Sequence, residues 1–438
     1  MKLKIGFVSL GCPKNLTDTE TMIGILAADH EIVANPEDAD IIIINTCGFI
    51  DDAKQESIDT IIEMGKYKEM GCLRKLIVTG CLAQRYANEI FDELPEVDAV
   101  VGTAGYNDIK DIIEQVAAAH QVRHLPDINR EIKVTTDRIL ATPPYSAYLK
   151  IADGCDNKCT YCIIPKLRGK YRSRRMEDIL SEAEKLAEKG VTELILIAQD
   201  TTNYGTDLYD KQTLHILIEK LSKIEKIKWI RVHYCYPEYI YPELIEVMAE
   251  NDKVCKYLDI PIQHASDSVL KRMGRRTTRK DCENLIHTLR EKIPDIILRS
   301  TFITGFPGET EEDFAQLRDF MEKIRFDRVG VFAYSAEEDT PAAKLPGQLE
   351  QEIKEERRNE LMMVQQKISY ENNRQKIGKT FEVLTEDTMD TNYVGRTMGD
   401  SPEIDGAVVF SGGEIKAGEY VKVKITDADQ YDLKGEQV

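Results

Sequence analysis

The first 120 residues alternate short apolar runs with longer amphipathic stretches. The runs "LKIGFVSL", "ADIIIIN", "RKLIVTG" and "AVVGT" predict strands, and the stretches between them predict helices. Apolar strands that alternate with helices are typical of a parallel sheet covered on both faces. We therefore expect residues 1–120 to form an N-terminal parallel-sheet α/β domain.

The alternation stops in residues 121–144, which end in "ATPP" and are expected to be a linker. It resumes six times between residue 145 and about residue 340. The six predicted strands are "YLKIADG", "ELILIAQD", "WIRVHYC", "KYLDIPI", "ILRSTFIT" and "RVGVFAYS". Right-handed β-α units curl toward a barrel, but the closed form needs eight of them. We expect a partial, open (βα)6 barrel.

Two further segments complete the predicted α/β architecture. Residues 350–376 are charged and helical but keep no apolar seam, so they are expected to pack on the barrel within a domain of residues 145–373. After Gly378, short strands separated by Gly and Asp turns predict a small antiparallel β-barrel in residues 374–438.

Composition narrows the class of protein. No apolar run approaches the roughly 20 residues of a membrane span, and the N-terminus reads as a first strand, so we expect a cytoplasmic protein without a membrane partner. The ten cysteines then favour metal or redox chemistry over disulfides. The formal net charge of −19 favours a basic partner over non-specific binding to nucleic acid.

Three cysteines each lie just beyond a predicted strand: Cys12, Cys47 and Cys81. The carboxyl ends of parallel strands meet at one edge of a sheet, where ligand sites form. Three buried core cysteines are the alternative. Because each of the three has a neighbouring glycine, the repeated pattern favours a shared metal or cluster site, whereas Cys72 lacks this placement.

A second set, Cys155, Cys159 and Cys162, follows the first barrel strand in "GCDNKCTYCIIP". A structural zinc site would need a fourth ligand from elsewhere, and Cys235 at the end of the third strand is the one cysteine placed to reach. Three thiolates and one open iron fit an iron–sulfur cluster better. His233 is expected to be a structural histidine, and so is His264.

The C-x3-C-x2-C spacing at this position resembles the radical S-adenosylmethionine superfamily. The resemblance implies a [4Fe-4S] cluster whose open iron binds S-adenosylmethionine and whose reduction yields a 5′-deoxyadenosyl radical. It also implies that Tyr161 lies near the adenine and that Gln199 and Asp200 lie near the methionine moiety. Ile303 and Gly305, in "FITGFPGET", are expected to meet the adenine on the same grounds.

The three regions in this order resemble the methylthiotransferases over essentially the whole chain. That resemblance implies a second [4Fe-4S] cluster on Cys12, Cys47 and Cys81, whose open iron carries the sulfur to be inserted. One S-adenosylmethionine then gives the methyl group, and another gives the radical. A reducing electron donor and a sulfur donor are further implied partners.

The wording of the motifs separates two branches of that family. "SLGCPKN", "NTCGFI", "GCLAQRY", "IADGCDNKCTYCIIP", "YCYPE" and "LDIPIQHAS" resemble the branch that acts on an aspartate side chain of a small-subunit ribosomal protein. The C-terminal barrel resembles a TRAM domain, usually an RNA-binding module, yet residues 374–438 hold 8 Lys and Arg against 13 Asp and Glu. A negative barrel is complementary to a basic ribosomal protein.

Two alternatives stay open at this point. One is the same chemistry on an adenosine of transfer RNA, and the other is a zinc-stabilised, non-catalytic ribosome-binding protein. The basic segments 166–175 ("KLRGKYRSRR") and 271–280 ("KRMGRRTTRK") either hold RNA or the ribosome, or are solvated surface.

Overall fold

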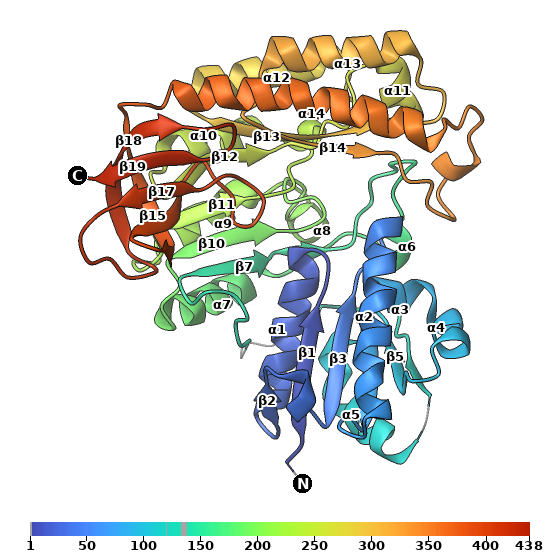
Figure 1. Cartoon of the computed structure of the whole chain (residues 1–438). Coiled ribbons are helices and arrows are strands. Elements are labelled where there is room, and N and C mark those ends of the chain that lie inside the picture. The colour runs from blue at the N-terminus through green and yellow to red at the C-terminus, as the bar shows by residue number, and fades with distance from the viewer. Residues whose placement is uncertain (1, 120, 133–137) are drawn as a thin grey trace.

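The computed structural model describes residues 2–119, 121–132 and 138–438. It has the three expected parts (Figure 1): an N-terminal domain, a central barrel and a small C-terminal barrel, with one long helix lying across the central barrel. No helix in these described ranges is long and apolar enough to cross a membrane.

The N-terminal domain is built on a six-stranded sheet, and every pairing in it is parallel, as expected. In spatial order its strands are β2 (Glu31–Val33), β1 (Lys4–Ser9), β3 (Ile41–Thr46), β4 (Lys75–Gly80), β5 (Ala99–Val101) and β6 (Val122–His124). Hydrophobic clusters lie on both of its faces. The unbroken apolar run of β3 follows from this double coverage.

Strand β6 corrects the predicted linker. It pairs with β5 through Val122, Arg123 and His124, so the sheet extends into the segment expected to connect the domains. Only Val122 of the three is buried, and a single apolar side chain is too little for a pattern to predict a strand. Residues 133–137 of the expected linker lie outside the described residues.

Five α-helices flank this sheet: α1 (Pro13–Ala27), α2 (Asp51–Glu69), α3 (Cys81–Arg85), α4 (Ala87–Glu93) and α5 (Ile109–Ala118). Two of them matter most for the site. Helix α1 follows β1 and helix α3 follows β4, so both begin at the carboxyl edge of the sheet. A helix N-terminus at that edge favours negative charge there.

The central barrel is confirmed as an open sheet of six parallel strands in sequential order. These are β7 (Ser146–Lys150), β10 (Glu193–Ile197), β11 (Trp229–Val232), β12 (Val254–Asp259), β13 (Ile297–Thr304) and β14 (Arg328–Ala333). A two-stranded ribbon, β8 (Ala152–Asp153) with β9 (Arg172–Ser173), follows β7. The intervening helices are α6 (Ile164–Arg168), α7 (Met176–Glu188), α8 (Thr206–Tyr209), α9 (Leu214–Leu221), α10 (Pro242–Glu250), α11 (Asp267–Arg272), α12 (Arg279–Lys292) and α13 (Glu311–Ile324).

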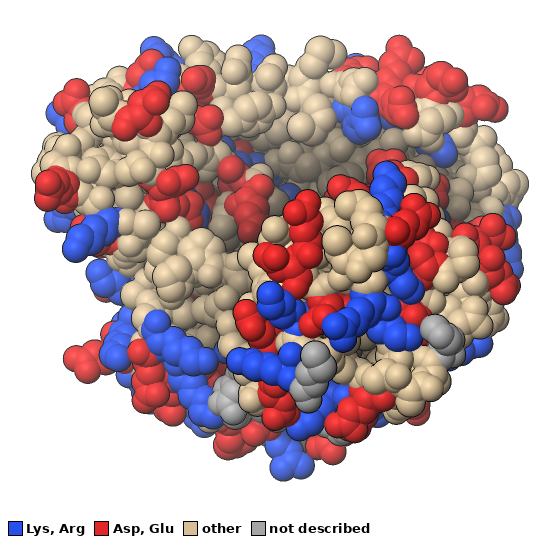
Figure 2. Space-filling view, turned by 60° about the horizontal axis from the view of Figure 1, so that its bottom comes forward, with Lys and Arg blue, Asp and Glu red and all other residues tan. Residues whose placement is uncertain are grey.

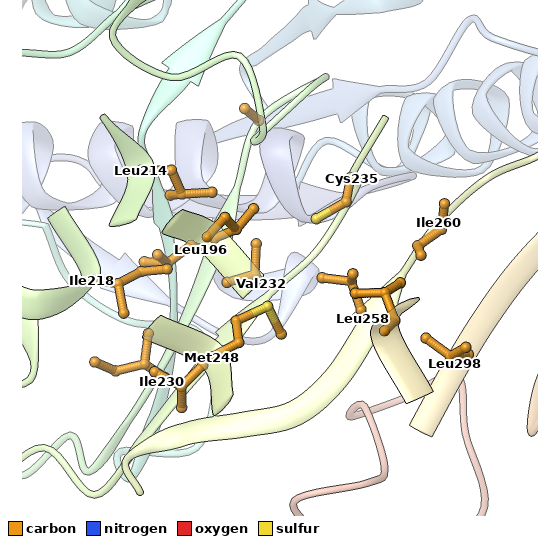
Figure 3. Packing of buried hydrophobic residues seen from close by; sticks show 14 of the residues in the cluster. Leu196, Leu214, Ile218, Ile230, Val232, Cys235, Met248, Leu258, Ile260 and Leu298 are labelled. Carbon is orange, nitrogen blue, oxygen red and sulfur yellow. The ribbon is translucent and has the colours of Figure 1, made fainter. Parts of the chain in front are cut away.

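The main core lies between these strands and their helices. Figure 3 shows strand residues such as Leu196 and Val232 among the helix residues Leu214, Ile218 and Met248. All five are at most 1 % exposed. Burial of this size drives the barrel to form and fixes the positions of the loops at its carboxyl end.

Helix α14 (Gln351–Arg374) packs along β14 and α13, with Leu361 and Ile368 buried, as expected for the charged segment. It leads into a closed five-stranded barrel: β15 (Thr380–Met389), β16 (Asn392–Thr397), β17 (Val408–Ser411), β18 (Tyr420–Ala428) and β19 (Leu433–Gln437). Four of its five pairings are antiparallel. Strands β17 and β19 pair in parallel because β18 lies between them in the chain but not in the barrel.

The C-terminal barrel is fixed to the central barrel by buried charges. Glu193, at the start of β10, accepts hydrogen bonds from Arg396 and from Arg231. Arg328 donates to Asp400 at 2.8 Å. Because a buried charge is costly to leave without its partner, this network holds the two barrels in one arrangement.

Candidate active site

Cys12, Cys47 and Cys81 come together at the carboxyl edge of the N-terminal sheet. Cys12 is the residue before α1, Cys47 follows β3, and Cys81 begins α3. Each thiol acts electrostatically on at least one of the other two. The side chains of Cys47 and Cys81 are buried, and Cys12 is partly exposed.

Glycines beside the cysteines allow this close approach. A Cβ on Gly11 would lie 2.7 Å from the Cβ of Cys47 and 3.0 Å from its sulfur. A Cβ on Gly48 would lie 2.9 Å from the Leu82 nitrogen, against the backbone of Cys81. Any side chain at either position would push two of the cysteines apart, which explains the Gly-Cys pattern in the sequence.

The electrostatics of the three thiols differ. Burial acts to raise the pKa of Cys12, but Lys14, Arg168 and backbone N–H groups of α1 together lower it. Burial raises the pKa of Cys47 to about 12, and Cys81 adds to the effect. Burial also raises the pKa of Cys81. A metal cluster that binds these sulfurs must therefore displace protons from at least two of them.

The second set of cysteines lies on the loop between β8 and α6. Within that loop the Cys162 N–H donates to the Cys159 carbonyl. The loop packs on the turn after α11, where Thr160 N–H donates to the Met273 carbonyl, and a Cβ on Gly274 would lie 2.5 Å from the Lys158 carbonyl oxygen. Burial raises the pKa of both Cys155 and Cys162.

Side chains from neighbouring strands hold this loop. The Tyr236 hydroxyl lies 2.6 Å from the Cys159 sulfur. Asn157 donates to the Asp200 carboxylate at 3.1 Å. An open pocket of about 180 Å³ lies beside the loop, lined by Asn157, Lys158, Tyr236, Glu238, Tyr239, Gly274 and Arg276.

Helix α6, which follows the second cysteine set, packs against the first set at the domain boundary. Cys81 packs against Ile163 and Leu167, which directly follow the second set. Arg168, the last residue of α6, reaches into the N-terminal domain and donates to Asn15 at 2.7 Å and to Asp18 at 3.0 Å. The loop of one set thus forms a wall of the other.

A chain of hydrogen bonds connects the two sites. Gln199 Nε2 donates to Asp153 at 2.9 Å, Arg168 donates to Asp153 and to Asn15, and Asn15 Nδ2 donates to the Thr46 carbonyl just before Cys47. These groups are nearly all buried, which strengthens the hydrogen bonds and fixes the relative position of the sites.

Gln199 and Asp200 follow the carboxyl end of β10. The Gln199 Oε1 atom is buried and has no hydrogen-bond partner within the described part of the chain. An orphaned acceptor of this kind fits a bound donor such as an amino group. Burial raises the pKa of Asp200 to about 6, while Thr202 and Asn157 lower it in part through hydrogen bonds.

Tyr161 and Ile303 pack in one hydrophobic cluster, although 142 positions separate them in the sequence numbering. Gly305 has another task in addition to any ligand contact. Its φ is +70°, and a Cβ there would lie 2.2 Å from Lys354 Cγ, so the residue must be small for α14 to pack. Its N–H donates to Glu309 at 3.0 Å.

Lys14 is a feature of the site that the sequence analysis did not single out. Its Nζ lies 3.4 Å from the centre of the Tyr234 ring, which belongs to the loop after β11. Tyr234 has a φ of +60°, a strained value for a tyrosine. Burial lowers the pKa of Lys14, and the charges of Cys12, Asp259 and Asp153 oppose that effect.

The donor sets fit iron–sulfur clusters. Each offers three thiols, and thiolates are the ligands of such clusters. In residues 2–119, 121–132 and 138–438, no group of three or more His, Cys, Asp or Glu side chains is arranged to hold a single metal ion.

Cys235 is not placed to act as a fourth ligand of the second cysteine set. It is fully buried in the main core, where Figure 3 shows it among apolar side chains, and its sulfur lies 3.5 Å from Thr201 Oγ1. His233 is within hydrogen-bond distance of Ser401, and His264 accepts from the Ser266 N–H. Both rings thus contact protein groups, and His264 Nε2 also lies 3.3 Å from a carboxylate oxygen of Glu309. Cys72 is exposed and lies away from the three sheet-edge cysteines, in the turn after α2.

The basic segments are partly buried. Arg168 is buried in the domain boundary, and Arg174 is buried beside Glu182 at 2.6 Å. Arg275 is buried with its guanidinium 3.8 Å from the centre of the Tyr236 ring. The exposed basic side chains of the two segments are Lys166, Lys170, Arg175, Lys271, Arg276 and Lys280. Several of these charges therefore build the site rather than a surface.

Comparisons with known proteins match each domain. Residues 149–321 match the Radical SAM superfamily, residues 377–438 match the TRAM domain, and residues 4–102 match Uncharacterized protein family UPF0004. The central match contains all three cysteines of the second set.

Full-length relatives decide the family. The chain is 56% identical over 437 residues to "Ribosomal protein uS12 methylthiotransferase RimO" of Clostridioides difficile (strain 630), which covers 99% of this chain and 98% of that protein. A protein of the same description from Clostridium botulinum (strain Eklund 17B / Type B) is 53% identical, with the same coverage of both chains. The chain belongs to this family of radical S-adenosylmethionine methylthiotransferases. It is accordingly an enzyme that uses S-adenosylmethionine and a [4Fe-4S] cluster.

Solved structures show the fold alone. The radical S-adenosylmethionine methyltransferase TsrM from Kitasatospora setae superposes with a TM-score of 0.56 at 13% identity, covering 75% of this chain and 73% of that chain. The cobalamin-dependent radical enzyme OxsB gives a TM-score of 0.54 at 15% identity, covering 84% of this chain and 56% of that chain.

Proposed function

We propose that the protein replaces a hydrogen on the β-carbon of an aspartate of ribosomal protein uS12 by a methylthio group. The full-length relatives carry uS12 methylthiotransferase in their descriptions, at 50% identity or more. The structural observation that carries the proposal is the contact between the elements of the two cysteine sets, with Cys81 packed on Ile163 and Leu167, which follow Cys162 in the chain. An enzyme that must both open a C–H bond and insert sulfur needs two such sites within reach of one carbon.

The chemistry requires bound groups because no side chain has a pKa suited to removing an unactivated hydrogen. When bound, the two [4Fe-4S] clusters and S-adenosylmethionine supply the electron, the radical, the sulfur and the methyl group. Cys155, Cys159 and Cys162 would hold the cluster that binds S-adenosylmethionine. The sheet-edge set Cys12, Cys47 and Cys81 would hold a second cluster. The electron donor and the sulfur donor are partners that this proposal requires.

Side chains of the protein bind S-adenosylmethionine and orient the cysteine loop. Gln199 presents its free Oε1 acceptor to the S-adenosylmethionine side of the site, and Asp200 holds the cysteine loop through Asn157. Tyr161 and Ile303 provide an apolar surface for the adenine. The Tyr236 hydroxyl, beside the Cys159 sulfur, supports the loop from the segment after β11.

The charge of the molecule favours a basic substrate. Figure 2 shows that one face is hollowed and that Asp and Glu side chains, with some Lys and Arg, lie along the rim of the hollow. The C-terminal residues 374–438 carry five more acidic than basic side chains. Complementary charge raises the rate of encounter with a basic ribosomal protein and disfavours transfer RNA. A cytoplasmic location belongs to the same proposal, because ribosomes are assembled there.

The experiment offers both substrates to one enzyme. The chain, reconstituted anaerobically with iron and sulfide, is given S-adenosylmethionine, a reductant and either purified uS12 or unmodified transfer RNA. We expect the intact mass of uS12 to rise by one methylthio group in place of one hydrogen, with the site on an aspartate. Modification of transfer RNA with uS12 unchanged would overturn the substrate, and zinc without sulfide in the purified protein would overturn the chemistry.

A further inference from the structure

Lys14 lies at the junction of the two cysteine sets. It is two residues from Cys12, and its Nζ stacks on the ring of Tyr234. Tyr234 is in turn two residues from Tyr236, whose hydroxyl contacts the Cys159 sulfur. One short segment after β11 therefore touches both sites, and Lys14 is the cation placed at its N-terminal-domain end.

The carboxylates around Lys14 already have cationic partners. Asp259 pairs with Arg299 at 3.1 Å, and Asp153 pairs with Arg168 at 3.2 Å. Asp18 pairs with Arg168 at 3.0 Å and with Lys150. Each pair satisfies charge that would otherwise be buried alone.

Lys14 has no carboxylate partner of this kind, and its strongest charge interaction is with the Cys12 thiol. Its residue exposure is only 8 %, yet within residues 2–119, 121–132 and 138–438 no carboxylate lies within 4.0 Å of its Nζ, and its ring contact is to the face of Tyr234. A cation–π contact orients an ammonium but leaves its hydrogen-bond donors free. A nearly buried cation with free donors is a site for an anion.

We propose that Lys14 binds the carboxylate of the substrate aspartate and so places its β-carbon between the two cysteine sets. The inference rests on the proposed function, since that function supplies the carboxylate. The β-carbon of an aspartate is bonded directly to the carboxyl carbon, so fixing the carboxylate fixes the carbon that reacts. The carboxylate does not have to bind Lys14 through both oxygens, because an ammonium acts as a point charge with three donors.

A rival role for Lys14 is to balance the negative charge of a cluster on Cys12, Cys47 and Cys81. The two roles differ in what Lys14→Met should change. If Lys14 binds the substrate, Lys14→Met should keep the iron and sulfide content but lose the preference for aspartate over asparagine in uS12. If Lys14 instead balances the charge of a cluster, Lys14→Met should lower the iron and sulfide content and leave the preference for aspartate unchanged.

The test is a double-mutant cycle in binding rather than turnover. The holoenzyme, with S-adenosylmethionine but no reductant, is titrated with uS12 and with uS12 in which the modified aspartate is replaced by asparagine. We expect the wild-type enzyme to prefer the aspartate form by about tenfold or more, as for a buried charge pair. Lys14→Met should abolish that preference with both clusters retained, and Lys14→Arg should restore part of it.

Lys54→Met is the matched control, since Lys54 is a partly buried lysine of the same domain that pairs with Glu337 at 3.1 Å. Its preference should equal that of the wild type. If Lys14→Met discriminates between the two substrates as the wild type does, the proposal is wrong. A wild-type enzyme that transfers no methylthio group to uS12 would instead overturn the proposed function, and the inference with it.

Discussion

Glu193 is a single residue that connects two domains by charge. It is fully buried, and it accepts hydrogen bonds from Arg396 at 2.8 Å, Arg231 at 3.2 Å and Ser146 at 2.9 Å. Burial acts to raise its pKa, but Arg396 and then Arg231 lower it to about 2. The ordinary carboxyl pKa in the unfolded chain is 4.5.

This depressed pKa predicts the acid sensitivity of the fold. A carboxyl whose pKa is lower when folded stabilises the protein above pH 4.5, and that stability is lost as the pH falls toward 2. The Glu193 contribution is roughly 3 kcal/mol by this linkage. In Glu193→Gln we expect a lower free energy of unfolding at pH 7 and a flatter decline below pH 4.5.

Urea unfolding of the cluster-free chain at a series of pH values measures both effects. Glu184→Gln, at an exposed position of α7, is the control and should follow the wild-type curve. A Glu193→Gln curve parallel to that of the wild type through the acid range would contradict the assignment.

At the scale of single residues, the sequence predicted those that belong to a recurring local motif and missed those that do not. The cysteines could be proposed as ligands because each follows a strand or forms a tight local motif. Arg168 and Lys14 have partners that lie far away in the sequence, and an isolated Arg or Lys carries no local signal. The wording "GCPKN" and the basic run 166–175 contained both residues but did not indicate their partners.

Among the elements, α6 is small but connects the two sites. Its five residues follow the second set of cysteines, contribute Leu167 to the contact with Cys81, and end in Arg168. Arg168 lies between Asp18 of α1 and Asp153 of β8, and its side chain is 2 % exposed. The position of α6 therefore depends on charge as well as on apolar packing.

Arg168→Met should separate the two sites. The substitution keeps much of the side-chain volume but leaves Asp18 and Asp153 with Lys150 as their shared cation. We expect a loss of about 3–5 kcal/mol in the free energy of unfolding. Urea unfolding measures the loss, and limited proteolysis reports loosening of the N-terminal domain.

Arg172→Met is the matched control in the same segment, because Arg172 donates to the backbone carbonyls of Arg168 and Lys170. It should lose less than Arg168→Met, about 1–2 kcal/mol, because its hydrogen bonds go to backbone carbonyls and not to buried carboxylates. Equal losses in the two variants would show that Arg168 has no special role in joining the domains.

The elements themselves were largely predictable. Six β-α units and a terminal β-barrel followed from hydrophobic period, since strands and helices of this length leave a clear pattern. Strand β6 was missed because one buried side chain makes no pattern, and the parallel β17–β19 pair was missed because strand order is set by tertiary contacts. The hydrophobic period of a strand does not indicate which strands it pairs with.

The whole molecule places two similar sites on opposite sides of one boundary. The N-terminal sheet and the central barrel both present the carboxyl ends of their strands there, and the C-terminal barrel is fixed to the central one by the Glu193 and Arg328 ion pairs. The arrangement predicts that the two cysteine sets have different roles in the reaction. Under the proposed function, the second set would serve the cleavage of S-adenosylmethionine, and the sheet-edge set would serve the insertion of sulfur.

The most direct test compares Cys47→Ser with Cys159→Ser in one assay that quantifies 5′-deoxyadenosine and methylthiolated uS12. Cys159→Ser should form neither product. Cys47→Ser should lack one of the two clusters, still release 5′-deoxyadenosine from S-adenosylmethionine, and yield no methylthiolated protein. Methylthiolated uS12 from either variant would contradict the account.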